Sequence, residues 1–338
     1  MARYVVRRFL WMIFVLWAIS MITFLIFYMI PSNPAVLALP RGATPEAIEQ
    51  VEDRMGLNAP IPMQYLDLLF GDSILLDKSE DTKGLLDWPP SFGYSFRNQQ
   101  PVRETIMSRL PVTAALAGGS ALLWLAMGIP IGILAATKPK SVRDRVATLF
   151  ALTGVSMPTF FLGILMLYFF FFKLTTWGVT VNGAPLFPPG WTPLHENPVQ
   201  WAQHLILPCM TIALTYAAIY SRMVRGTLLD VLGEDYIRTA RAKGLSERRV
   251  TYKHGLRSAL TPVVTLLGLD LGGLLGGAII TERVFNLPGL GALAIGAITN
   301  VDLPVILGTV LFASFFVVIS NIIIDIVYAL LDARVRYS

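Results

Sequence analysis

Six long apolar stretches constrain this chain more than any other feature of its sequence. A helix needs about 20 apolar residues to cross the hydrocarbon core of a bilayer. Of the 338 residues, 54% are hydrophobic and only 14% are charged, whereas soluble domains carry about 25% charged residues. Too few polar residues remain to cover a soluble surface. The sequence therefore predicts an all-α integral membrane protein with six transmembrane helices, at about residues 9–30, 110–136, 146–172, 205–224, 259–280 and 304–331.

The distribution of basic residues predicts which side of the membrane each segment faces. If the N-terminus is cytoplasmic, 18 of the 27 Lys and Arg residues fall in the inner segments, and 14 of the 22 acids fall in the outer ones. Such a bias places both termini in the cytoplasm. The excess of basic residues in this chain is therefore explained by its orientation in the membrane. The basic residues are not interleaved with aromatic residues in a soluble domain, so we expect no nucleic-acid partner.

The spacing of the apolar stretches divides the chain into three parts. Residues 1–30 form the first transmembrane helix, whose apolar core is longer than that of a signal peptide, so we expect it to be retained. Residues 31–105 form an extracytoplasmic loop that is too long for a simple connector. Helical patterns at 45–54 and 63–70 predict a small folded cap. Residues 106–338 form a five-helix core.

Motifs for catalysis and metal binding are missing from the sequence. Cys209 is the single cysteine, and no two of the three histidines have metal-ligand spacing. No lysine follows a glycine, so the phosphate-binding loop of nucleotide hydrolases is absent, as is the GxSxG motif. We predict no catalytic residues, no metal site and no cofactor in this chain. Any nucleotide would be bound by another chain.

The predicted cytoplasmic segment 226–258 is unusually long and has a helical pattern. Glu234 and Asp235 suit a helix N-terminus, and Gly244 suits the end of that helix. Ser246 can cap a second short helix. The segment is therefore predicted to fold as a helix, a glycine turn and a second helix.

The first of these two helices carries a small apolar stripe. Tyr236, Ile237, Ala240 and the stem of Arg241 fall on one side, and we expect this stripe to be exposed between charges. One interpretation is a basic amphipathic segment on anionic membrane lipid. The other is a docking surface for a partner protein with a groove. The acids at the start of the helix favour the partner, because anionic lipid would repel them.

Residues 235–244 resemble the cytoplasmic EAA loop of membrane subunits of ABC importers. Aligned on Gly244, the family's Glu-Ala-Ala triplet falls on residues 238–240, and its closing motif falls on residues 254–257. This form is similar to the oligopeptide/dipeptide permease family, in the first (B-type) of its two membrane subunits. Other similar segments lie at 54–60, 92–95, 270–272, 285–291 and 331–337, so the resemblance covers nearly the whole chain.

The resemblance implies a permease that takes up di- and oligopeptides across the bacterial cytoplasmic (inner) membrane. It implies four kinds of partner besides membrane lipid: a second homologous permease subunit, two ATPase subunits that hold ATP and Mg, and an extracytoplasmic substrate-binding protein. Residues 106–338 would be the permease core, and 226–258 would contain the coupling helix. The coupling residues implied are Glu234, Asp235, Tyr236, Arg238, Ala240, Arg241, Lys243 and Gly244.

Asp270 lies in the middle of the predicted fifth span, where a charge costs about 2.5–3.5 kcal/mol or more. It either lines the pathway and meets the ammonium group of a peptide, or it forms a hydrogen bond between helices, and the second interpretation is favoured. Glycines at every fourth position predict close helix packing, with the second permease subunit as the expected partner. Glu282 and Arg283 are expected as a surface pair at the outer end. The candidate pathway residues are Asp270, Gly272, Gly276 and Glu282.

Other functions remain as alternatives. The same architecture could import a nickel chelate or another small solute. A secondary transporter would normally show an internal repeat and paired broken helices with ionisable residues, and an intramembrane enzyme would need a nucleophile and base within the spans. The sequence shows neither pattern.

Overall fold

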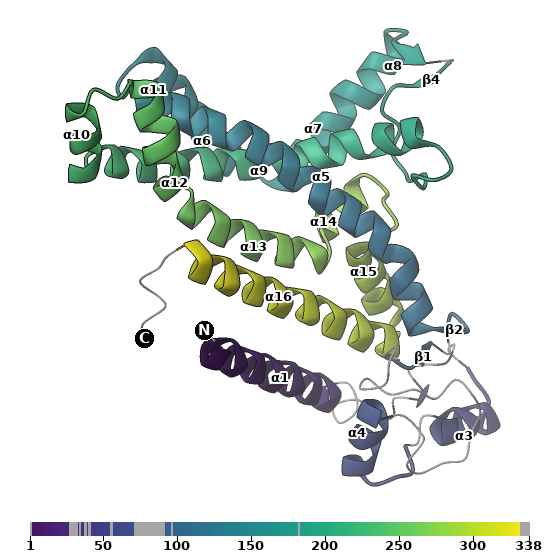
Figure 1. The fold of residues 1–338 in the computed structure, drawn as a ribbon. Helices are drawn as coiled ribbons and strands as arrows, with labels where there is room; N and C mark the ends of the chain where they lie inside the picture. The colour runs from purple at the N-terminus through teal and green to yellow at the C-terminus, as the bar shows by residue number, and fades with distance from the viewer. Residues whose placement is uncertain are drawn as a thin grey trace. The chain divides into compact units, whose positions relative to one another are not determined.

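The computed structural model describes residues 2–26, 33, 35–36, 39, 42–54, 57–70, 92–95, 97–181 and 183–331. Within these ranges the chain is mostly helical, as predicted, and Figure 1 shows the order of its elements. The longest helices are α1 (Ala2–Phe24), α5 (Val102–Thr137), α6 (Val142–Ser156), α9 (Pro198–Leu232), α13 (Thr261–Leu275), α15 (Leu290–Asn300) and α16 (Leu303–Leu331).

Shorter elements connect these helices. They are α3 (Pro45–Arg54), α4 (Ile61–Phe70), α7 (Thr159–Met166), the π-helix η3 (Leu167–Lys173), α8 (Leu174–Thr176), α10 (Asp235–Ala242), α11 (Glu247–Arg249), the π-helix η4 (Val250–Gly255), α12 (Leu256–Ala259) and α14 (Ile279–Val284). Two small antiparallel hairpins pair β1 (Tyr94–Ser95) with β2 (Gln100–Pro101) and β3 (Thr180–Val181) with β4 (Ala184–Pro185).

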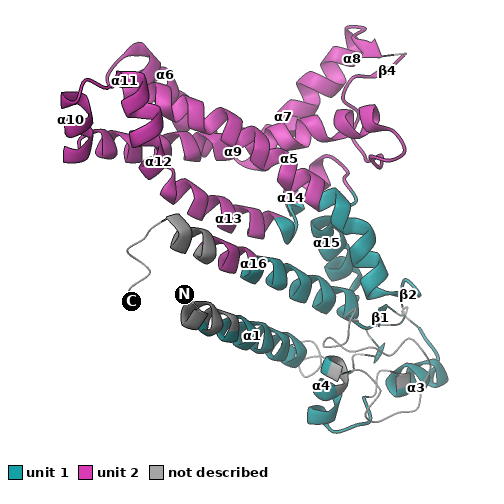
Figure 2. Cartoon of the chain, in the orientation of Figure 1, with its two compact units in different colours: residues 1–113, 275–279, 288–319 teal, residues 114–274, 280–287, 320–338 magenta. Residues whose placement is uncertain are grey.

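The chain forms two compact units, which Figure 2 shows in different colours. Unit 1 comprises residues 1–113, 275–279 and 288–319, and unit 2 comprises residues 114–274, 280–287 and 320–338.

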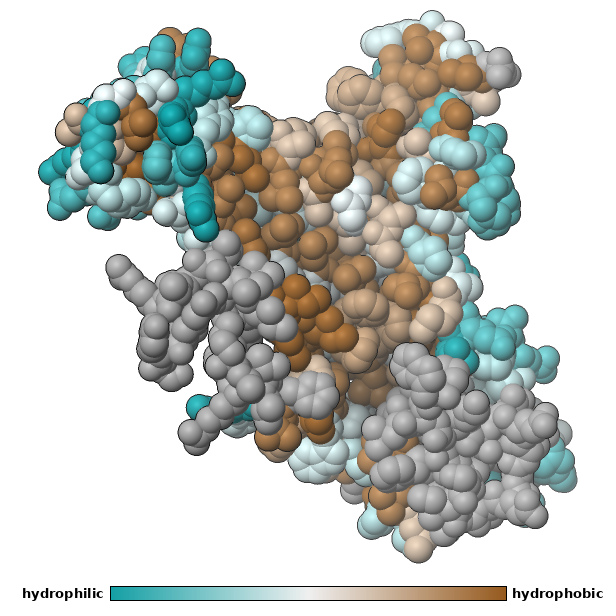
Figure 3. Space-filling view, in the orientation of Figure 1, coloured by the Kyte–Doolittle hydropathy of each residue, from teal (hydrophilic) through white to brown (hydrophobic). Residues whose placement is uncertain are grey.

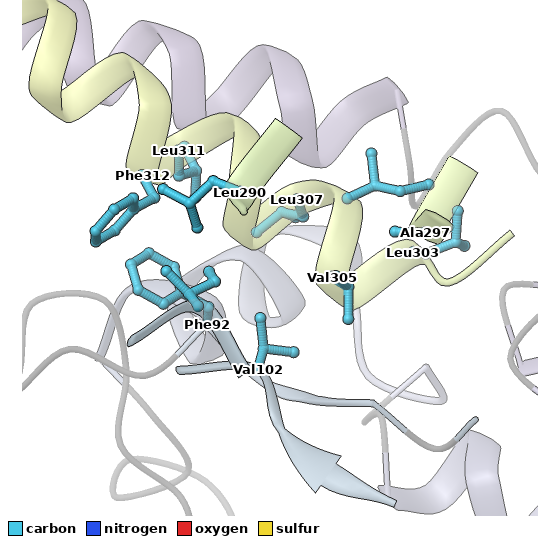
Figure 4. Close-up of a cluster of buried hydrophobic side chains, with 11 residues drawn as sticks. Phe92, Val102, Leu290, Ala297, Leu303, Val305, Leu307, Leu311 and Phe312 are labelled. Atoms are coloured by element: carbon cyan, nitrogen blue, oxygen red, sulfur yellow. The ribbon is translucent and has the colours of Figure 1, made fainter. Parts of the chain in front are cut away.

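The core of unit 1 joins Phe92 and the start of α5 to α15 and α16, as Figure 4 shows. Phe92, Val102 and Ile106 contact buried side chains of α16 there. A Cβ atom on Gly308 would lie 2.6 Å from Cγ1 of Val102, so only glycine lets α16 approach this closely. The other cluster members are Leu290, Ala297, Leu303, Val305, Ile306, Leu307, Leu311 and Phe312.

A polar cluster fixes the β1–β2 hairpin to the turn between α15 and α16. Asp302 accepts hydrogen bonds from the Ser95 hydroxyl at 2.5 Å and from the Asn98 side-chain amide at 3.2 Å. The Arg97 guanidinium donates to the backbone carbonyl of Asn300. Val301 lies between these residues in the left-handed conformation, with φ +54°. The hairpin thus has a fixed place in unit 1.

The predicted helices of the outer loop are confirmed as α3 and α4, the second beginning two residues earlier than expected. α3 contributes Val51 to a small cluster with buried Ala35 and the partly buried Leu39, Ile48 and Leu57. α4 contacts α1 through Tyr65, whose hydroxyl lies 2.7 Å from that of Ser20. Residues 71–90, which resemble an insertion, lie outside the described residues.

Helix α9 is central to unit 2, and small residues let its neighbours approach. Cβ atoms built on Gly132 and Gly154 would lie 2.6 Å from side chains of α9, those of Val224 and Ala218. Gly132 belongs to α5 and Gly154 to α6, so both helices lie directly against α9. Small residues at membrane helix interfaces permit this close packing.

Four of the described helices are long and apolar enough to cross a membrane: Val102–Thr137, Thr159–Thr176, Pro198–Leu232 and Leu303–Ile324. A bent pair, Glu247–Ala259 with Thr261–Leu275, makes a fifth candidate. The predicted second, fourth and sixth spans fall on α5, α9 and α16. The predicted first span corresponds to the apolar helix Leu10–Phe24, and its last four residues lie outside the described ranges.

The predicted boundaries of the third span are wrong. The chain breaks at Met157, which is extended with ψ 123°, and Pro158 then caps α7. The residue before a proline avoids the helical conformation, which explains the break. The span-length helix is therefore Thr159–Thr176, and α6 is a separate helix.

The predicted fifth span also ends too late. α13 stops at Leu275, and Gly277 has φ +119° before α14 begins at Ile279. A residue with such a φ interrupts a helix, and glycine tolerates it best. The predicted glycine stripe is therefore divided between α13 and the connection after it.

Candidate functional site

The predicted cytoplasmic segment 226–258 folds at the C-terminal end of α9. α9 ends at Leu232, Gly233 follows as its C-cap, and Glu234 is the N-cap of α10. The predicted helix, turn and second helix are present as α10, Gly244 and α11. The sequence thus predicted the order of these elements correctly.

The apolar stripe of α10 faces inward, which corrects the expectation that it would be exposed. Ile237 and Ala240 are buried with Val250 of η4, against the partly buried Val231, Leu232 and Leu245. Tyr236 lies outside this cluster and is 46% exposed. Because Ile237 and Ala240 are covered within the chain, Tyr236 is the large apolar side chain of α10 that stays exposed.

The turn after α10 is confirmed at Gly244. Its φ is +76°, and its N–H donates to the carbonyl of Arg241 at 2.9 Å. Nothing lies within 4 Å of a Cβ atom built there, so the need for glycine comes from the backbone alone. Ser246 is the N-cap of α11 as predicted, although its side chain makes no capping hydrogen bond.

Arg241 holds the two short helices and the end of α9 together. Its Nε atom donates to Oε1 of Glu247 at 2.8 Å, and its Nη1 atom donates to the Leu232 carbonyl at 3.3 Å. The side chain therefore bridges α9, α10 and α11. The sequence placed Arg241 beside the apolar stripe but did not indicate these partners.

The outer face of α10 is charged and polar. Asp235 and Arg238 form an exposed ion pair at 3.4 Å, and Lys243 is exposed at the turn. Figure 3 shows a hydrophilic surface over α10 and α11, in contrast with the apolar surface of the neighbouring long helices. This arrangement gives a rigid, polar projection at the end of α9.

The second half of the segment returns to α9. Gly255 of η4 lies against Leu228. A Cβ atom built on Gly255 would lie 3.2 Å from Cδ1 of Leu228. The Thr227 hydroxyl donates to the Ala259 carbonyl at 3.0 Å. Tyr236 donates to the Ser258 hydroxyl at 3.3 Å, which links α10 to α12. These contacts connect α10, η4 and α12 at the end of α9.

An ion pair that the sequence analysis missed fixes α6 to α9. Nε and Nη2 of Arg225 donate to the two carboxylate oxygens of Asp144, at 2.6 and 2.9 Å. The Lys140 N–H donates to the same carboxylate at 2.8 Å. These hydrogen bonds, chiefly the one from Arg225, lower the pKa of Asp144 from 3.8 to about 2. The partners are 81 residues apart, so no local pattern indicates the contact.

We expect Asp144→Asn to lower the thermal midpoint of the detergent-solubilised protein at pH 7. Because the folded pKa lies below the ordinary value, the stabilisation is complete above about pH 4 and is lost as the pH falls through 2. Thermal unfolding between pH 2 and 8 should show the difference narrowing below about pH 4. Glu196→Gln removes an exposed acid and should leave the midpoint unchanged. Equal midpoints for Asp144→Asn and the wild type at pH 7 would contradict the prediction.

The candidate pathway residues differ in burial and in the elements that carry them. Asp270 is half-buried, and Oδ2 accepts a hydrogen bond from the Tyr220 hydroxyl at 2.7 Å. Gly272 is buried, whereas Gly276 follows the end of α13. Glu282 is fully buried and Arg283 is exposed, so the expected surface pair is wrong.

Part of the close packing predicted for the glycines is between two helices of this chain. A Cβ atom on Gly268 would collide with the side chain of Ile324 on α16, so α13 and α16 approach closely here. The partner predicted for these glycines was the second permease subunit. Gly273 differs, because nothing lies within 4 Å of its Cβ position. Within the described ranges, no group of three or more His, Cys, Asp and Glu residues could hold a metal ion.

Comparisons with known proteins agree with this arrangement. Residues 128–337 match the family model described as "Binding-protein-dependent transport system inner membrane component", and residues 1–117 match the model of its N-terminal part. A putative peptide transport system permease protein of Brucella abortus (strain 2308) is 37% identical over 320 residues, which cover 95% of this chain and 94% of that protein. The glutathione transport system permease protein GsiC of Escherichia coli (strain K12) is 36% identical over the full length of both.

Among solved structures, the chain is similar to one of the inward-facing MetNI methionine ABC transporter. The match has a TM-score of 0.50 at 19% identity and covers 68% of this chain and 97% of that one. At this identity the similarity concerns the fold.

Proposed function

Since this chain belongs to the family of binding-protein-dependent transport system inner membrane components, we propose that it is a permease subunit of an ATP-driven importer of di- and oligopeptides. It is a multi-pass membrane protein that forms part of the translocation pathway and hydrolyses no ATP itself. The substrate follows from relatives that are named as peptide and glutathione permeases. Those names favour peptides over a nickel chelate.

One observation supports the coupling role above all others: α10 and its glycine turn form a rigid projection on the end of α9. The projection presents Asp235, Arg238 and Lys243 outward, while its Ile237 and Ala240 are buried. A polar surface of this kind suits a protein groove. We propose that it docks into a cytoplasmic ATPase subunit, and that closure of two such subunits on ATP and Mg moves the projection.

The remaining partners follow from the same proposal. A second homologous permease subunit would complete the pathway, with membrane lipid around both subunits. An extracytoplasmic binding protein would deliver the peptide to the outer side, where the segment 31–105 and the β1–β2 hairpin lie. Both termini would be cytoplasmic, in a bacterial inner membrane.

Cysteine labelling tests this orientation, with an expected pattern for each side. In a Cys209→Ser background, Glu49→Cys and Glu196→Cys should react with an impermeant thiol reagent in intact cells, because both positions are exposed on proposed outer segments. Ser246→Cys, which is exposed in the proposed inner segment, should react only after permeabilisation. Labelling of Ser246→Cys from outside would contradict the topology.

Reconstitution of the complete importer tests the function. The chain, its partner permease, the ATPases and the binding protein are placed in proteoliposomes, and uptake of labelled peptides is measured. We expect uptake to need both ATP and the binding protein. Uptake that persists without ATP, driven by an ion gradient, would instead show a secondary transporter.

A further inference from the structure

Asp270 accepts a hydrogen bond from a tyrosine that belongs to a group of aromatic side chains on two other helices of unit 2. Trp124 of α5 stacks on Tyr216 of α9, with ring centroids 4.8 Å apart. The ring of Tyr220 lies 5.8 Å from that of Trp124, and its hydroxyl donates to Asp270 of α13. Tyr216 and Tyr220 are four residues apart, so they share one face of α9. Three helices thus contribute to this aromatic–carboxylate cluster, defined as Trp124, Tyr216, Tyr220 and Asp270.

The four side chains of the cluster differ in their exposure. Trp124 and Tyr220 have no exposed surface, whereas Asp270 and Tyr216 are only partly buried. Gly273 lies three residues after Asp270 on the same side of α13, is exposed, and has open space around its Cβ position. A ligand can therefore approach the carboxylate along α13.

The carboxylate keeps unused capacity to bind a cation. An ionised carboxylate has about four acceptor positions, and the Tyr220 hydroxyl occupies one. Among the residues that the structure describes, no Lys, Arg or His forms an ion pair with Asp270. Asp144 differs from Asp270, because both of its carboxylate oxygens accept hydrogen bonds from Arg225. An acid without a counter-ion inside a membrane protein points to a functional site.

We propose that the aromatic–carboxylate cluster is a subsite for the α-ammonium group of the translocating peptide. The ammonium group would meet the free carboxylate positions of Asp270 and the partly exposed face of Tyr216. Carboxylates and aromatic faces both attract cationic amines, and more strongly away from water. Tyr220 is a positioning residue, because its hydrogen bond fixes the orientation of the carboxylate.

This inference rests on the proposed function, and the two can be tested separately. Reconstituted wild-type importer is given one labelled peptide with a free N-terminus and the same peptide N-acetylated. Uptake is measured for the wild type, Asp270→Asn, Asp270→Glu and Tyr220→Phe. For each peptide, the ratio of variant to wild-type uptake removes any preference of the binding protein.

We expect Asp270→Asn to reduce uptake of the free peptide by roughly tenfold to a hundredfold, because a hydrogen bond to a charged group is lost. The ratio for the acetylated peptide should stay near one. Asp270→Glu retains the charge and should restore most of the free-peptide uptake. Tyr220→Phe should cause a smaller loss, again confined to the free peptide.

A structural role for Asp270 gives a different result. Asparagine still accepts the hydrogen bond from Tyr220, so assembly and ATPase activity should be near wild type, and uptake of both peptides should be retained. That outcome, or an equal loss for both peptides, would overturn the inference and leave the proposed function intact. Absence of any peptide uptake by the wild-type importer would instead contradict the proposed function.

Discussion

Gly244→Val is expected to abolish ATP-driven uptake while the protein still inserts into the membrane. Gly244 has φ +76°, and a left-handed conformation costs other residues about 1–2 kcal/mol, more when the side chain is β-branched. The turn would relax, and the contacts of Arg241 with Glu247 and Leu232 would be lost with it. The projection formed by α10 and its glycine turn would then no longer have a fixed shape. Uptake in proteoliposomes should fall by about tenfold or more.

The matched control is Gly244→Asn at the same position. Asparagine tolerates left-handed backbone better than other non-glycine residues, and the open space around Gly244 accommodates a side chain. We expect this variant to keep most of the uptake. Equal loss in both variants would show that the side chain blocks a contact with the ATPase, and normal uptake by Gly244→Val would contradict the coupling role of the turn.

Gly277→Ala is expected to prevent accumulation of folded protein. Gly277 has φ +119°, and a Cβ atom there would lie 2.6 Å from backbone atoms of Gly291. Backbone cannot move aside as a flexible side chain can, so strain and collision together should cost about 3 kcal/mol or more. The measurement is the yield of monodisperse protein in detergent, together with its thermal midpoint.

Gly296→Ala provides the comparison within the same unit. Gly296 lies inside α15, and nothing lies within 4 Å of its Cβ position. Alanine favours a helix by about 1 kcal/mol over glycine, so this variant should be as stable as the wild type or slightly more so. A wild-type yield for Gly277→Ala would show that the connection after α13 can rearrange.

The sequence predicted those features that depend on local chemistry. Gly244 marked a turn because few other residues adopt its backbone conformation, and Ser246 marked the start of α11. The long apolar stretches identified α5, α9 and α16. In each case neighbouring residues alone determine the structure.

Features that depend on distant contacts could not be predicted in this way. α10 has only eight residues, and its helical period does not show whether Tyr236 or Ile237 faces the interior. The packing of Ile237 against Val250 makes Ile237 the buried residue. The ion pair of Asp144 joins helices far apart in the sequence. The break at Met157 was missed because apolar residues continue on both sides of Pro158.

In the proposed coupling role, the length of α9 sets how far the projection formed by α10 and its glycine turn would travel. Its 35 residues extend for about 52 Å at 1.5 Å per residue, whereas the hydrocarbon core is about 30 Å thick. Pivoting such a rod by about 10° around one end displaces the other end by about 9 Å, given that helical rise. In the proposed topology, a small angular change of α9 near the outer side of the bilayer would therefore become a linear displacement of α10 on the inner side.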